Sequence, residues 1–60
     1  MKQKEFDEMP FATQVRIKGR LAKLDSFIST SSAGYSWAHF KYLDTHRRVT
    51  KRHRQVERIF

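Results

Sequence analysis

The chain of 60 residues contains no cysteine, so neither a disulfide nor a zinc site with thiolate ligands can stabilise its fold. A domain of this size buries only about 60% of the surface that its unfolded chain exposes, and its stability is therefore marginal. So small a core leaves no room for a large enclosed active site. We expect a single small basic domain over residues 1–60, in a reducing compartment, without catalytic residues, a metal or a cofactor.

The balance of charge indicates the class of partner. Thirteen Lys and Arg residues against six Asp and Glu give a net charge of +7 and a pI near 10.4. This balance favours polyanions, nucleic acid above all. The start MKQKEFDEMP lacks the apolar core of a secretion signal, and no apolar run approaches the roughly 18 residues of a membrane span. We expect a soluble protein of the cytoplasm, or of the nucleus in a eukaryote, with no membrane partner.

Positive charge is concentrated in two parts of the chain. Residues 15–24 hold four basic residues and no acid, and residues 46–60 hold six Lys or Arg and one Glu. Residues 1–14 are slightly acidic and form a candidate flexible N-terminal segment. The small polar residues and the glycine of STSSAG, residues 29–34, are typical of a turn.

The stretch VRIKGRL, residues 15–21, alternates apolar and basic residues and so fits a strand. One face of that strand holds Val15, Ile17, Gly19 and Leu21, and the other holds Arg16, Lys18 and Arg20. A helix is the alternative, because Ile17, Leu21, Leu24 and Ile28 also recur at helical spacing. That helix would carry Gly19 in its interior at a cost of about 1 kcal/mol, so we favour the strand over a small all-α domain.

The aromatic stretch YSWAHFKYL, residues 35–43, predicts a second strand, because aromatic side chains favour half-buried pleated surfaces. Its two faces hold Trp37, His39, Lys41 and Leu43 on one side and Ala38, Phe40 and Tyr42 on the other. The two predicted strands, about 15–24 and 35–43, form a short antiparallel sheet.

From Asp44 onward the apolar period changes to that of a helix, and Asp44 or Thr45 can cap its start. The positions that recur at helical spacing are Val49, His53, Val56 and Phe60. We therefore predict an α+β fold in which a basic C-terminal helix, about 45–60, packs on the sheet. Its basic stripe comprises Arg47, Lys51, Arg54 and Arg58, flanked by Arg48 and Arg52. Such a stripe suits the phosphates of a nucleic acid, and like charges one turn apart can leave the segment disordered until a polyanion binds.

The order VRIKGRL, Gly34, AHFKYL and then His46-Arg47-Arg48 resembles the opening of OB-fold single-stranded-DNA-binding proteins. In that family a strand of form V-x-x-x-G-x-L precedes a glycine, a strand of form A-x-F-x-L and arginines. Here Tyr42 stands at the last position of the second pattern, and Leu43 follows it. The resemblance covers residues 15–48, and because a five-stranded OB barrel needs more than 60 residues, it implies a truncated or strand-sharing relative.

The resemblance implies that unpaired bases stack on aromatic side chains of the sheet while Lys and Arg follow the backbone. The candidates for stacking are Trp37, Phe40 and Tyr42. Phe40 is better explained as a core residue. Trp37 shares its face with His39 and Lys41, so it is the better candidate for an exposed platform.

Other constellations argue against an enzyme or a metal site. The histidines at 39, 46 and 53 are spaced by seven, which on one helix separates them by about 10.5 Å along the axis, too far to share an ion. The acids near the N-terminus have no basic partner or phosphate-binding loop beside them.

We therefore predict a small nucleic-acid-binding protein, for DNA or RNA, that contacts phosphates and can stack bases. The predicted contact residues are Arg16, Lys18, Arg20, Trp37, Lys41, Arg47, Arg48, Lys51, Arg52, Arg54 and Arg58. The alternative is a small regulatory or inhibitory module that docks on an acidic surface of a larger enzyme or polymerase. Under either hypothesis, pairing of edge strands would allow a homo-oligomer.

Overall fold

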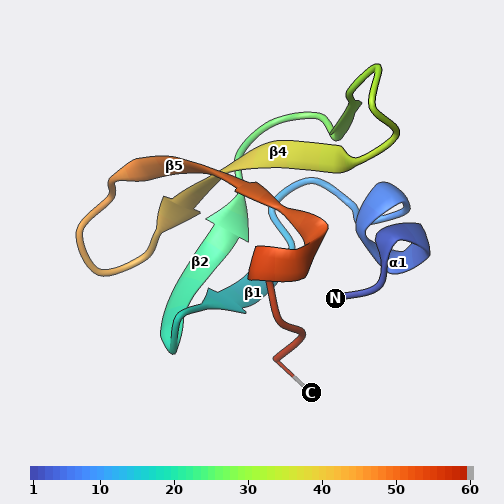
Figure 1. Cartoon of the computed structure of the whole chain (residues 1–60). Helices are drawn as coiled ribbons and strands as arrows, with labels where there is room; N and C mark the ends of the chain where they lie inside the picture. The colour runs from blue at the N-terminus through green and yellow to red at the C-terminus, as the bar shows by residue number, and fades with distance from the viewer. Residues whose placement is uncertain (60) are drawn as a thin grey trace.

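The computed structural model describes residues 1–59, which form one antiparallel sheet of five strands with a short helix before it and a 3-10 turn after it (Figure 1). The elements in chain order are α1 Gln3–Asp7, β1 Gln14–Ile17, β2 Arg20–Leu24, β3 Ser29–Thr30, β4 Ser36–Tyr42, β5 Arg48–Arg52 and η1 His53–Gln55. Within residues 1–59 there is no helix with the length and apolar character needed to cross a membrane.

A hairpin of β1 and β2 replaces the single strand predicted over residues 15–24, and the alternative helix there is wrong. Lys18 and Gly19 form its two-residue turn with φ angles of 51° and 78°, which is the geometry of a type I′ turn. The turn shifts the alternation by one residue. Ala22 therefore points into the core with Ile17, whereas Leu21 is 43% exposed on the outer side.

β4 is the central strand and organises the sheet. It pairs with β5 along one edge and with both β2 and β3 along the other, so Phe40 lies opposite Leu24 on one side and Val49 on the other. β2 and β3 pair with the same edge of β4, one after the other, and the loop of residues 25–28 separates them. Side chains on the outer side of β4 thus have neighbours on both flanks.

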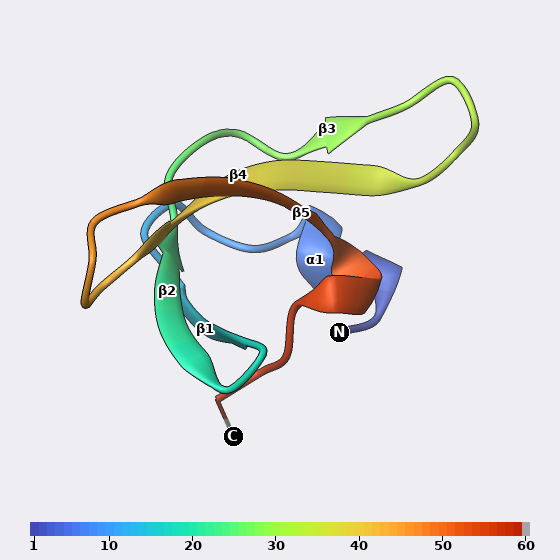
Figure 2. The same cartoon turned by 60° about the vertical axis from the view of Figure 1, so that its left-hand side comes forward.

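The sheet curls until the C-terminal segment lies beside β1, as Figure 2 shows. The N–H of Arg16 donates to the carbonyl of Glu57 at 2.9 Å, and the N–H of Glu57 donates to the carbonyl of Arg16 at 2.8 Å. These two bonds satisfy backbone groups that an open β1 edge would leave unpaired. The result is a small, partly closed barrel with an inner face and an outer face.

The core fills the inside of this curved sheet. The buried apolar side chains are Phe6, Val15, Ile17, Ala22, Leu24, Ala38, Phe40, Tyr42 and Val56. Phe6 is the contribution of α1: its ring lies 5.9 Å from the ring of Phe40 and 6.4 Å from that of His53. α1 therefore covers one end of the barrel through a single aromatic side chain.

The predicted α+β fold with a basic helix over residues 45–60 is wrong. A turn, β5 and η1 occupy residues 45–55, and Phe60 lies outside the described residues. The β-branched Val49 and Thr50 favour a strand, and Val49 pairs with Phe40 of β4. The helical spacing of Val49 and Val56 arises from two separate contacts with the core. The fold is mainly β, and it is neither α+β nor all-α.

Candidate nucleic-acid interface

The outer sides of β4 and β5 form one continuous surface. The inward side chains of β4, from Ser36 to Tyr42, are buried, so the alternate positions point outward. Residues directly opposite in an antiparallel pair share a face, which places Trp37 beside Arg52 and Lys41 beside Arg48. We call this surface the β4–β5 face; its residues are Tyr35, Trp37, His39, Lys41, Arg48, Thr50 and Arg52.

Part of the β4–β5 face is hollowed by about 450 Å³, and we call this depression the aromatic hollow. Its lining comprises Tyr35, Trp37, His39, Thr50, Lys51, Arg52 and Gln55. The rings of Trp37 and His39 meet edge to face with centroids 5.5 Å apart. The His39 ring is fixed in turn by a 2.8 Å hydrogen bond between Nδ1 and Thr50 Oγ1. The half-buried Trp37 is therefore held in one orientation.

The guanidinium of Arg52 lies over the ring of Tyr35, 4.4 Å from its centroid. This cation–π contact orients the arginine without neutralising it. The backbone N–H of Arg52 also donates to Gln55 Oε1 at 3.1 Å, which ties the start of η1 to the end of β5. One wall of the hollow thus combines an aromatic ring with a fixed positive charge.

Positive charge dominates the hollow and its surroundings. None of the described residues that line it is acidic. Arg48 is paired, because its Nε lies 2.9 Å from Asp25 Oδ2. Within residues 1–59 no ion pair involves the four other predicted cations of this region, Lys41, Lys51, Arg52 and Arg54. These four are available to bind an anion.

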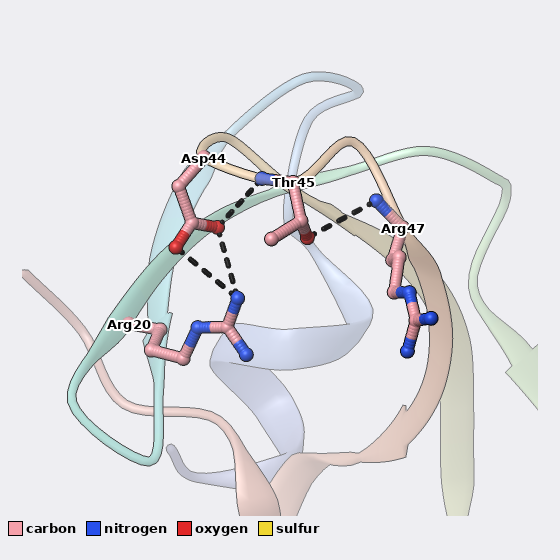
Figure 3. A network of polar contacts seen from close by, with 4 residues as sticks. All are labelled: Arg20, Asp44, Thr45 and Arg47. Carbon is pink, nitrogen blue, oxygen red and sulfur yellow. Dashed lines mark hydrogen bonds and ion pairs between the residues drawn. The ribbon is translucent and has the colours of Figure 1, made fainter.

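A different group of residues joins the β1–β2 hairpin to the turn between β4 and β5, as Figure 3 shows. Arg20 Nη2 lies 3.1 Å from both carboxylate oxygens of Asp44, and its guanidinium covers the ring of Tyr42. Asp44 accepts the N–H of Thr45 at 2.8 Å, and Thr45 Oγ1 accepts the N–H of Arg47 at 3.4 Å. This network fixes the turn that places β5 against β4.

Desolvation raises the pKa of Asp44, but the hydrogen bond and the charge of Arg20, together with the Thr45 N–H, outweigh it and hold that pKa below its usual value. Asp44 is therefore ionised at neutral pH and partly neutralises Arg20. Arg20 thus supports the hairpin turns and lies apart from the β4–β5 face.

The structure divides the predicted contact residues into two sets. Those on or beside the β4–β5 face are Trp37, Lys41, Arg48, Lys51, Arg52 and Arg54. The others lie elsewhere: Arg16 on β1, Lys18 and Arg20 at the β1–β2 hairpin, Arg47 in the turn between β4 and β5, and Arg58 after η1. Arg58 pairs with Glu5 at 3.4 Å. The basic stripe of Arg47, Lys51, Arg54 and Arg58 does not form, because these residues belong to separate elements.

Tyr35 and Lys23, which lie on or beside the face, were not predicted. Tyr35 precedes Trp37 by two residues, and this spacing on one side of a strand is the signal that could have identified it. Lys23 of β2 lies opposite Lys41 and extends the positive row. The outward direction of Lys23 could not be predicted from the sequence alternation, because the turn at Lys18 and Gly19 changes the side on which the residues of β2 point.

The three histidines lie on different elements: His39 on β4, His46 in the turn before β5 and His53 in η1. Among residues 1–59 no group of three or more His, Cys, Asp or Glu side chains is placed to hold a metal ion.

Comparisons of the chain with protein-family models, curated protein sequences and solved structures give no match. The resemblance to OB-fold single-stranded-DNA-binding proteins over residues 15–48 therefore stays a prediction, and the assignment of a function depends on the β4–β5 face.

Proposed function

We propose that this protein binds nucleic acid through the β4–β5 face, without catalysing a reaction, in the cytoplasm or the nucleus. The observation that carries the proposal is the aromatic hollow, in which Trp37 and Tyr35 lie beside Arg52 and other cations that have no acidic partner within residues 1–59.

The cations supply the contacts with phosphates. Lys41 and Arg52 project from adjacent strands on the outer side, and Arg54 is exposed in η1, one residue before Gln55 of the hollow. Lys51 is half-buried and lies opposite the inward Ala38, so it projects from the other side of β5 than Arg52 does. It also lines the hollow, and the flexible stem of a lysine lets its ammonium reach solvent. Cations spread over several ångströms along a strand suit the spacing of a nucleic acid backbone.

The aromatic side chains favour single strands. A base stacked on an aromatic ring contributes about 1–3 kcal/mol, and only an unpaired base can leave its own stack to reach such a ring. Trp37 is half-buried and immobilised by His39, so its ring can receive a base without losing further freedom. We therefore expect a single strand to bind more tightly than a duplex of the same sequence.

Fluorescence anisotropy of labelled single-stranded DNA, single-stranded RNA and duplex DNA tests the proposal. Trp37→Ala should weaken binding of the single strands by about tenfold, while Trp37→Phe, which keeps a ring, should retain most of the affinity. Circular dichroism checks that both variants fold. Unchanged affinity of a folded Trp37→Ala protein would refute stacking at this site.

The same measurement separates the second hypothesis, docking on an acidic surface of a larger enzyme or polymerase. Equal and weak binding of all three probes, together with one acidic protein retained after nuclease treatment, would assign the positive charge to a protein partner. Duplex binding as tight as single-strand binding would instead indicate recognition by phosphates alone.

A further inference from the structure

Two phenylalanines point out of the fold at a place that the nucleic-acid proposal does not use. Phe11, in the loop after α1, is 67% exposed, and Phe27, in the loop between β2 and β3, is 90% exposed. Both line a hollow of about 380 Å³, which we call the phenylalanine hollow. The other residues that line it are Asp7, Met9, Leu24, Ser26 and Ile28.

The loop that carries Phe11 is fixed by hydrogen bonds to β2. The N–H of Ala12 donates to the carbonyl of Leu24 at 3.1 Å, and the N–H of Leu24 donates to that of Thr13 at 2.9 Å. Thr13 Oγ1 also donates to the carbonyl of Pro10 at 2.7 Å. Ala12 adopts a φ of 67°, which residues other than glycine rarely adopt. These contacts fix the backbone of the loop from which the exposed Phe11 projects.

The loop that carries Phe27 is fixed in the same way. Ser26 Oγ accepts the N–H of His39 at 2.9 Å and donates to the carbonyl of Phe27 at 3.1 Å. The N–H of Asp25 donates to the carbonyl of His39 at 2.9 Å. The backbone of both loops is thus ordered, so docking a partner here would cost little loss of loop entropy. Figure 1 shows these two loops, which belong to parts of the chain well separated in sequence.

The phenylalanine hollow is lined by one acid, Asp7, and by no Lys or Arg, although the chain as a whole carries +7. Asp7 lines the hollow and accepts a hydrogen bond from the Ser36 hydroxyl; within residues 1–59 no cation pairs with it. Glu8 follows Asp7 in the chain, whereas Asp25, which precedes Ser26, is paired with Arg48 and adds no net charge. Nucleic acid and anionic lipid would be repelled here. A basic partner with apolar side chains would be attracted.

We propose that the phenylalanine hollow is a docking site for a segment of another protein, which inserts an apolar side chain between Phe11 and Phe27 and places a Lys or Arg beside Asp7. The phenylalanine hollow shares no lining residue with the aromatic hollow, so this docking does not require nucleic acid to be bound. Together the two surfaces would let the protein connect a nucleic acid with a protein partner.

The probe for this site is a short blocked peptide in which leucine and phenylalanine are flanked by lysines, titrated into ¹⁵N-labelled protein. We expect the largest amide shifts at Phe11, Leu24 and Phe27. A control peptide with glutamates in place of the lysines should bind about tenfold more weakly. Shifts confined to other residues, or equal binding of the two peptides, would overturn the proposal.

A matched pair of variants localises the contact. Phe27→Ser removes an exposed ring and should weaken the lysine peptide about tenfold, whereas Leu21→Ser removes an exposed apolar side chain outside the hollow and should leave binding unchanged. Sedimentation of the free protein at rising concentration provides a second readout. Self-association that Phe27→Ser abolishes would assign the hollow to a second copy of the chain and overturn the proposal of a different partner.

Discussion

The dependence of binding on salt gives the most quantitative test of the β4–β5 face. Each phosphate that a protein cation neutralises on a single strand contributes about −0.7 to the slope of log K against log salt. Four of the predicted cations on or beside the face have no acidic partner within residues 1–59: Lys41, Lys51, Arg52 and Arg54. Contacts by all four give a slope of about −2.8, which is an affinity loss of about fifty-fold when salt rises fourfold.

The perturbation is the double variant Lys41→Gln, Arg52→Gln. It removes two of the four contacts, so the slope should fall to about −1.4 and the loss over the same salt range to about sevenfold. The control is Arg16→Gln, Lys18→Gln, which removes the same charge from β1 and its turn, beyond β2 from the hollow. This control should keep the slope of the unaltered protein.

Fluorescence anisotropy of a labelled single-stranded oligonucleotide, at two NaCl concentrations that differ fourfold, measures all three slopes. Equal slopes for the two double variants would show that charge acts from everywhere on the surface. That result would refute the assignment of phosphate contacts to the β4–β5 face.

Three further predictions concern the fold. Phe6→Ala should lower the free energy of unfolding by about 3–5 kcal/mol, because it removes the ring that packs on Phe40. Urea titration should find this variant largely unfolded, and a stable variant would show that α1 does not complete the core. Lys18→Asn should raise the free energy of unfolding, measured by urea titration, by up to about 1 kcal/mol, since Asn tolerates a positive φ better. A lower free energy of unfolding would contradict the type I′ turn. Folding lowers the pKa of Asp44 from 3.8, so its pair with Arg20 stabilises the fold fully above pH 3.8. This stabilisation is lost as the pH falls through the pKa of Asp44 in the folded protein. The melting temperature of Arg20→Gln should therefore lie below that of the unaltered protein at neutral pH and approach it in acid.

The faces of the central strand could be predicted from sequence because a strand alternates strictly. The pattern placed Trp37, His39 and Lys41 on one side and Phe40 on the other, and the structure has the same arrangement. Alternation failed where two residues make a complete turn. Lys18 and Gly19 reverse the chain inside a run that alternates without a break in sequence. The reversal shows only in the structure, where the inward positions change from odd numbers, such as Ile17, to even numbers, such as Ala22.

The C-terminal part could not be predicted because its structure depends on a partner distant in sequence. Val49 and Val56 have helical spacing, but Val49 is held by pairing with β4 and Val56 by the core after η1. Arg52 was predicted beside a helical stripe and lies instead opposite Trp37. Several of the predicted contact residues thus lie together on or beside the β4–β5 face, while the predicted element that presents them was wrong.

Trp37 is the only tryptophan of the chain, so intrinsic fluorescence reports directly on the aromatic hollow. The decisive measurement is this fluorescence during titration with an unlabelled single-stranded oligonucleotide, compared with anisotropy of the labelled strand under the same conditions. Stacking of a base on Trp37 predicts quenching that saturates at the concentration where anisotropy saturates. Saturated anisotropy with unchanged Trp37 emission would show that nucleic acid binds elsewhere.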